Sequence, residues 1–155
     1  MSLNIVLYQP EIPHNTGSIG RTCLLTGTKL HLIKPLGFSV DDKMLRRSGL
    51  DYWKDVEITY YDSFEEFYKL HQDKRIFLST TKTNRFYSDV EFKDGDFIMF
   101  GRESSGVPDD VSDLFEERHI RVPMIDTTTR SLNLANTATA VLYEAYRQIG
   151  YPNMK

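Results

Sequence analysis

The fold is decided first by residues 5–21, which read IVLYQPEIPHNTGSIGR. The four apolar residues Ile5–Tyr8 predict a buried strand, and Pro10 ends it because proline cannot donate to a strand ladder. Asn15 is a suitable helix cap, so a helix is predicted from there to Gly27. A buried strand that leads through a short loop into a helix is the repeating unit of an α/β protein.

The same alternation continues along the chain. Further apolar runs of strand length lie at Leu30–Ile33, Val56–Tyr61, Ile76–Ser79, Phe97–Phe100 and Ile120–Val122. Helical patterns lie at Asp41–Leu50, after the capping box that begins at Ser63, and at Leu134–Ile149, whereas Lys82–Gly95 is polar and predicts a surface loop. Such alternation predicts parallel strands joined by right-handed crossovers, in a sheet covered by helices on both faces.

Composition narrows the class of protein. The 155 residues suit one domain spanning 1–155, and 40% hydrophobic residues suffice for a core. Lys+Arg 19 against Asp+Glu 22 gives a net charge of −3, which excludes a generally basic nucleic-acid binder. The single Cys23 excludes an intrachain disulfide framework. No apolar run has the length of a membrane span and no signal peptide precedes the first strand, so a soluble cytoplasmic protein is expected.

The first of three unusual loops leads into the first helix. Arg21 lies about one turn inside that helix, where its guanidinium can point back toward the loop. Gly17 and Gly20 supply only part of a GxGxxG pattern, so a dinucleotide site is weakly supported. A capped helix with a surface arginine is the plain structural alternative.

The second loop, residues 100–108, follows a strand directly. Gly101 and Gly106 have the spacing of the glycines in a P-loop, but the Lys-Ser/Thr pair that holds phosphates and Mg²⁺ is missing. A nucleoside triphosphatase is therefore not expected. Glu103 is either a ligand to a cationic or polar group or a partner for Arg102 or Arg121, and a tight structural turn is the structural alternative for this loop.

The third loop, residues 121–136, carries more hydroxyls and amides than one helix cap requires, among them Asn133 and Asn136. The four histidines show no metal-ligand spacing, so no metal site is expected. Cys23 lies on an apolar helix face and is expected in the core. The best basic patch for RNA phosphates consists of Lys43, Arg46 and Arg47, with Lys82 and Arg85 as additions.

Taken together, the three loops resemble the signature motifs of the SPOUT-superfamily RNA ribose 2′-O-methyltransferases. The motifs are NTGSIGR at 15–21, GRESSGVP at 101–108 and SLNLAN at 131–136. The stretches NIVLYQPEIP at 4–13, PLGF at 35–38, DDK at 41–43 and SGLDY at 48–52 are similar to the minimal bacterial members. Those members methylate the wobble ribose, of cytidine or 5-carboxymethylaminomethyluridine, in leucine tRNAs.

The resemblance implies a parallel-sheet SPOUT fold whose C-terminal part forms a deep trefoil knot, although chains generally avoid knots. In the family the knot holds S-adenosylmethionine in a bent shape, largely through backbone groups. By position, the residues that line the cofactor are Ser79, Thr80, Gly101, Glu103, Val122, Met124, Ser131 and Leu132.

The chemistry that the resemblance implies is transfer of a methyl group from a sulfonium to a ribose hydroxyl. The family assigns the deprotonation step to the residue that is Arg21 here. Since a guanidinium is a poor base at neutral pH, gripping the adjacent phosphate and stabilising the developing alkoxide is an equally physical role. Asn15, Asn136 and Tyr143 are placed beside the ribose.

The resemblance also implies an obligate homodimer, with the final helix as a packing surface. The chain has no room for a separate RNA-binding domain, so the dimer itself must contact the tRNA anticodon stem-loop. Two alternatives stay open: an enzyme that acts on another tRNA position or on ribosomal RNA, and a non-catalytic RNA-binding protein.

Overall fold

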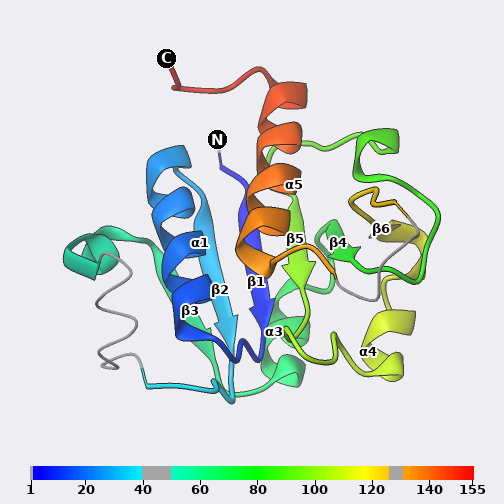
Figure 1. Ribbon diagram of the computed structural model, residues 1–155, viewed down its shortest axis with the longest axis horizontal. Coiled ribbons are helices and arrows are strands. Elements are labelled where there is room, and N and C mark those ends of the chain that lie inside the picture. Colours follow the sequence, from blue (N-terminus) through cyan, green and yellow to red (C-terminus); the bar gives the residue numbers. More distant parts are fainter. Residues whose placement is uncertain (1, 40–49, 126–130) are drawn as a thin grey trace.

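The protein is a six-stranded, wholly parallel sheet, as seen in a computed structural model that describes residues 2–39, 50–125 and 131–155 (Figure 1). The strands are β1 Asn4–Tyr8, β2 Lys29–Ile33, β3 Ile58–Tyr61, β4 Ile76–Ser79, β5 Phe97–Phe100 and β6 His119–Ile120. Their order in the sheet is β3-β2-β1-β5-β4-β6, and every pair is parallel. The predicted α/β architecture is confirmed.

Helices cover both faces of the sheet. The α-helices are α1 Pro13–Thr26, α3 Phe64–His71, α4 Asp109–Asp113 and α5 Leu134–Ile149, and the 3-10 helices are η1 Leu50–Asp55, η2 Tyr87–Asp89 and η3 Glu116–Arg118. α1 and α5 pack against each other in front of the central strands, while α3 lies behind the sheet (Figure 1).

The alternation of side chains along β1 explains why both faces are covered. Ile5 and Leu7 belong to the core beneath α1 and α5, whereas Val6 and Tyr8 belong to the opposite core around Phe67. Successive side chains of a strand point to opposite faces, so an apolar run needs a partner layer on each side. Burial of each such side chain contributes about 1.5–3 kcal/mol.

Several predicted boundaries need correction. α1 begins at Pro13, with Ile12 as its N-cap, so the prediction that Asn15 caps this helix is wrong. Proline suits a first helical position because its missing N–H would be unpaired there anyway. The last strand is shorter than predicted, and the polar stretch 82–95 contains η2 and the buried Phe92. The predicted helix 41–50 lies almost wholly outside the described residues.

The final helix matches its prediction, Leu134–Ile149, and ends at Gly150 with a φ of 86°. A left-handed residue of this kind is tolerated best by glycine. Cys23 is fully buried, as predicted.

Strand register brings distant loops to one edge of the sheet. Leu7 of β1 pairs with Phe100 of β5, Phe100 pairs with Ser79 of β4, and Ser79 pairs with Ile120 of β6. The loops that follow these strands therefore meet at the carboxyl edge, which is where open parallel sheets bind ligands.

Candidate functional site

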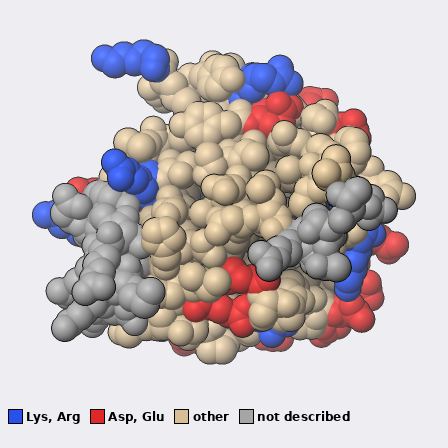
Figure 2. Space-filling model, in the orientation of Figure 1, with Lys and Arg blue, Asp and Glu red and all other residues tan. Residues whose placement is uncertain are grey.

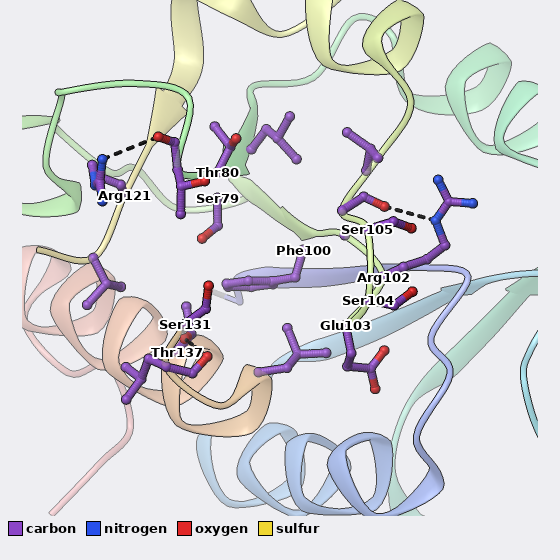
Figure 3. Close-up of a pocket in the computed structure, with 18 of the residues that line it drawn as sticks. Ser79, Thr80, Phe100, Arg102, Glu103, Ser104, Ser105, Arg121, Ser131 and Thr137 are labelled. Atoms are coloured by element: carbon purple, nitrogen blue, oxygen red, sulfur yellow. Dashed lines mark hydrogen bonds between the residues drawn. The ribbon is translucent and has the colours of Figure 1, made fainter. Parts of the chain in front are cut away.

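A pocket of about 730 Å³ opens at this carboxyl edge (Figure 3). Its walls come from the segments after β4, β5 and β6 and from the start of α5, with Asn15 contributed by α1. All the residues expected to line a cofactor lie around it: Ser79, Thr80, Gly101, Glu103, Val122, Met124, Ser131 and Leu132. Residues from four separate segments thus converge on one cavity of the size that small-molecule sites have.

The second loop is a tight turn that requires its first glycine. Arg102 and Gly106 exchange two main-chain hydrogen bonds, of 3.1 and 2.9 Å. A Cβ on Gly101 would lie 2.6 Å from the Gly106 backbone, and Gly106 itself has a φ of 65°. The turn keeps main-chain groups close to the pocket, where a side chain at position 101 would displace the loop.

Glu103 caps the start of α1 from the second loop. The main-chain N–H groups of Glu11 and Ile12 each donate to its carboxylate at 2.9 Å, and Asn15 Nδ2 donates to it at 3.3 Å. A carboxylate at a helix N-terminus is stabilised by the unpaired N–H groups there. Glu103 therefore pairs with neither Arg102 nor Arg121 through its carboxylate. It holds the N-cap residue Ile12 and the preceding Glu11 by their N–H groups, and Asn15 lies inside the helix.

Glu11 makes the reciprocal contact. Its carboxylate accepts hydrogen bonds of 2.9 Å from both the main-chain N–H and the hydroxyl of Ser104. These bonds to the charged form lower the pKa of the Glu11 carboxyl. The first and second loops are thus joined from both sides.

The third loop is joined to the first through two asparagines. Asn133 Nδ2 donates to Asn15 Oδ1 at 3.1 Å, while Asn133 Oδ1 accepts from the N–H groups of Ala135 and Asn136 and so caps α5. Glu103, Asn15 and Asn133 therefore form one hydrogen-bonded chain across the three loops. Asn133 was not among the predicted site residues, although its position at the start of the last helix was a usable signal.

Arg121, in the wall of the pocket, joins the segment after β6 to the segment after β4. Arg121 donates from its guanidinium to the carbonyls of Thr81 and Thr83, at 3.2 and 3.3 Å. The carbonyl of Ile120, the residue before Arg121 in the chain, accepts from the N–H of Thr80 at 2.9 Å. This side of the pocket is consequently held by main-chain contacts as well as by the sheet.

Three of the residues placed beside the ribose do not line this pocket. Arg21 is exposed on α1, Asn136 is exposed in the first turn of α5, and Tyr143 is 43% exposed farther along α5. They lie on the two helices that form the front face of the molecule in Figure 1. Only Asn15 of that group reaches the pocket.

The predicted RNA contacts divide into three kinds. Lys43, Arg46 and Arg47 lie outside the described residues. Lys82 lines the pocket and forms an ion pair of 2.6 Å with Asp109. Arg85 donates to the main-chain carbonyls of Glu117 and His119, at 2.7 and 3.2 Å, so its guanidinium already has a structural task.

A buried polar network lies outside the pocket and was missed by sequence reasoning. His31 contacts Asn4 Oδ1 at 2.9 Å and the Tyr61 hydroxyl at 2.8 Å, and that hydroxyl contacts His71 at 3.0 Å. Burial lowers the pKa of His31 to about 4. Residues on neighbouring strands 30 positions apart carry no sequence signal of such a contact.

Within residues 2–39, 50–125 and 131–155, no group of three or more His, Cys, Asp or Glu side chains is arranged to hold a metal ion. No helix of the same part of the chain is long and apolar enough to cross a membrane.

The parallel sheet, the pocket at its carboxyl edge and the three joined loops define an α/β protein with a pocket where such sheets bind ligands. Residues 2–143 match the SpoU rRNA Methylase family, and the chain belongs to that family. The resemblance seen in the three motifs is thereby confirmed.

Relatives that match over nearly the whole chain have more specific names than the family. The chain is 48% identical over 151 residues to the tRNA (cytidine(34)-2′-O)-methyltransferase of Escherichia coli strain K12, covering 97% of this chain and 96% of that one. A solved structure that concerns 2-OH methylation of C/U34 on tRNA superposes with a TM-score of 0.89 and 41% identity, covering 96% of each chain. The SpoU methyltransferase AviRb of Streptomyces viridochromogenes, solved with AdoMet, shares the fold at a TM-score of 0.83 and 24% identity, over 94% of this chain and 57% of that one.

Proposed function

We propose that this protein methylates the 2′-hydroxyl of the ribose at nucleotide 34 of tRNA, a cytidine or modified uridine in leucine isoacceptors, with S-adenosylmethionine as donor. The observation that carries the proposal is the pocket in which the three motif loops meet and are hydrogen-bonded through Glu103, Asn15 and Asn133. The 48% sequence identity with a tRNA (cytidine(34)-2′-O)-methyltransferase, over 97% of this chain, supports nucleotide 34 of tRNA as the substrate.

The pocket suits S-adenosylmethionine in size and in chemistry. A cavity of about 730 Å³ lies within the range that small-molecule ligands occupy. The close Gly101–Gly106 turn leaves main-chain groups available for the ligand, and Ser79, Thr80 and Ser131 add hydroxyls. When bound, the cofactor supplies a methyl group on a positively charged sulfur, which is already a good leaving group.

The chain's own residues then have to orient the acceptor and manage its proton. Asn15 is held at the pocket by Glu103 and Asn133, so its amide has one fixed orientation. Arg21 is assigned to grip the phosphate next to the ribose and to stabilise the developing negative charge on the 2′-oxygen. Asn136 and Tyr143 are assigned to the ribose side, and Lys82 and Arg85 with Lys43, Arg46 and Arg47 to the RNA backbone.

A homodimer is part of the proposal. Figure 2 shows few charged side chains over α1 and α5. α1 carries Leu25 at 70% exposure and α5 carries Tyr143 at 43%. Exposed apolar side chains on one face favour an interface with another molecule. Light scattering of the purified protein should give twice the mass of the chain, and a monomer at micromolar concentration would contradict this part.

A trefoil knot in the C-terminal part is also proposed. β6 lies at the edge of the sheet, whereas α5 packs over the central strands and against α1, so the chain must cross back over β4 and β5. Pulling the unfolded chain by its ends tests the proposal, because a tightened knot shortens the extended length. A full-length extension would exclude the knot.

The enzyme assay uses labelled S-adenosylmethionine and bacterial tRNA that lacks ribose methylation at position 34, with Arg21→Ala alongside. Label that maps to the ribose of nucleotide 34 and is lost in the variant is the expected result. Label at another tRNA position, or only in ribosomal RNA, would replace the substrate but keep the reaction. Cofactor binding without transfer to any RNA would favour a non-catalytic RNA-binding protein.

A further inference from the structure

The loops after β1 and β5 are joined by two carboxylates, each of which accepts hydrogen bonds from the other loop. Glu103 accepts from the N–H groups of Glu11 and Ile12, and Glu11 accepts from the N–H and hydroxyl of Ser104, with all four distances at 2.9 Å. We call these four hydrogen bonds the Glu11–Glu103 exchange. The motif resemblance covers Glu103, but it assigns no role to Glu11.

We infer that Glu11 is a positioning residue, which orients Glu103 and through it Asn15 at the pocket. The inference rests on the proposed function, because it concerns the same methyl-transfer site. Glu11 is not among the residues that line the pocket, so it acts through the loop that it holds.

The contact between Glu11 and Ser104 fixes the orientation of the main chain next to Glu103. The Ser104 N–H belongs to the peptide unit that directly follows the Glu103 Cα, so a carboxylate bound to it fixes that peptide plane. The second bond, from the Ser104 hydroxyl, makes the contact bidentate and leaves little freedom for rotation. With this plane fixed, the Glu103 carboxylate can reach two main-chain donors and Asn15 Nδ2 at the same time.

The backbone of Glu11 is itself held on its other side. Gly37 N–H donates to the carbonyl of Pro10 at 2.9 Å, and a Cβ on Gly37 would lie 2.8 Å from Glu11 Cα. Gln9, two residues earlier, has a φ of 46°, which a non-glycine residue adopts only where its surroundings enforce it. The backbone that carries the Glu11 side chain is therefore held in place, as a positioning role requires.

A cap for α1 does not explain Glu11. The N–H groups at the entry to the helix donate to Glu103, whereas both hydrogen bonds of the Glu11 carboxylate within the described part of the chain go to Ser104 of the second loop. If Glu11 only stabilised the fold, Glu11→Gln would lower the melting temperature and leave turnover unchanged. A positioning role predicts a change in turnover at temperatures where the variant is fully folded.

The test compares Glu11→Gln and Ser104→Ala with Glu57→Gln. Glu57 is a matched control, since it is an exposed carboxylate paired with Lys29 at 4.0 Å at the opposite end of the strands. For Glu11→Gln we expect kcat to fall by about 10- to 100-fold, the range in which misplaced catalytic groups act, with the Kd for S-adenosylmethionine changed less than about threefold. Ser104→Ala should lose less, because its main-chain N–H remains, and the double variant should lose no more than Glu11→Gln.

Wild-type kcat and KM in folded Glu11→Gln would overturn the inference. So would a loss explained wholly by weaker cofactor binding.

A second measurement is independent of turnover. Hydrogen exchange at the Ile12 N–H, which contacts Glu103 and not Glu11, should become faster in both Glu11→Gln and Ser104→Ala and stay unchanged in Glu57→Gln. Unchanged exchange in the first two variants would show that Glu11 does not orient Glu103. If wild-type protein fails to methylate tRNA, the proposed function fails, and the exchange experiment still decides the role of Glu11.

Discussion

Asn133 donates a hydrogen bond of 3.1 Å to Asn15, although 118 positions separate the two residues. The same Asn133 side chain caps α5, so the cap of the last helix and the polar chain of the pocket share one residue. Asn15 in turn donates to Glu103, which caps α1. Helix termini and the candidate active site are therefore built from the same hydrogen bonds, and variants that disturb one should disturb the other.

Replacement of Asn133 by alanine tests this link. The variant loses a helix cap, which should lower the free energy of unfolding by about 1 kcal/mol, and it also frees the Asn15 amide, which should reduce methyl transfer at least about tenfold. Ser63→Ala is the control because Ser63 caps α3 with a bond from Glu66 N at 3.1 Å, away from the pocket. Equal activity losses in the two variants would show that the effect comes from stability alone.

Glu103→Gln should cost both stability and activity. Its amide can accept with only one end, so one of the N–H groups of Glu11 and Ile12 loses its acceptor. Because these N–H groups are only partly buried or exposed, the lost hydrogen bond should cost about 1 kcal/mol. Urea unfolding and the labelled-methyl assay measure the two effects. Glu144→Gln, which disturbs an ion pair on α5, should leave methyl transfer unchanged, and activity in Glu103→Gln equal to that control would be the contrary result.

Gly101→Ala should weaken cofactor binding. The added Cβ would meet the Gly106 backbone at 2.6 Å, so the turn at the pocket must shift. Titration calorimetry with S-adenosylmethionine should show a Kd raised at least about tenfold. Gly95→Ala is the matched control, since its strain comes from a φ of 87° in open space and should cost only about 1 kcal/mol of stability. An unchanged Kd in Gly101→Ala would remove the turn from the cofactor site.

Lys82 and Asp109 form an ion pair, and we expect replacement of the two residues to have opposite effects on tRNA binding. If Lys82 contacts an RNA phosphate, Asp109 competes for it at 2.6 Å, so Asp109→Asn should tighten tRNA binding and Lys82→Met should weaken it. The slope of log K against log salt should fall by about 1 for Lys82→Met. Filter binding at several salt concentrations checks both, and a slope equal to the wild type would place Lys82 away from the RNA.

Stability should fall in mild acid because of His31. Burial lowers its pKa in the folded state to about 4, whereas the unfolded chain binds a proton at the usual value of about 6.5. The folded state is thus favoured fully above about pH 6.5, and this advantage is lost as the pH falls toward 4. Urea unfolding should show about 2 kcal/mol lost between about pH 7.5 and about pH 5.

One variant attributes that loss to His31. His31→Gln, whose side chain does not titrate, should show a much flatter pH dependence than the wild type. A wild-type slope in His31→Gln would assign the acid sensitivity to other groups, of which His71 is the nearest, since burial lowers its pKa as well.

Local patterns determined the elements of this protein and the three loops that matter. The apolar run Ile5–Tyr8 allows only a strand buried on both faces, and Gly150 ends the last helix because it tolerates a positive φ. The residues that the motif resemblance assigns to the cofactor all line one pocket in the structure.

Only the tertiary structure decided which side chains hold the loops together. Asn15 looked like a helix cap, yet it lies inside α1 and joins two loops through hydrogen bonds to Glu103 and Asn133, 88 and 118 positions away. The Glu11–Ser104 contact and the His31–Tyr61 contact arise in the same way, from strands brought side by side by the sheet order. Hydrogen bonds depend on distances of about 3 Å in space, and separation along the chain carries no information about them until the strand order is known.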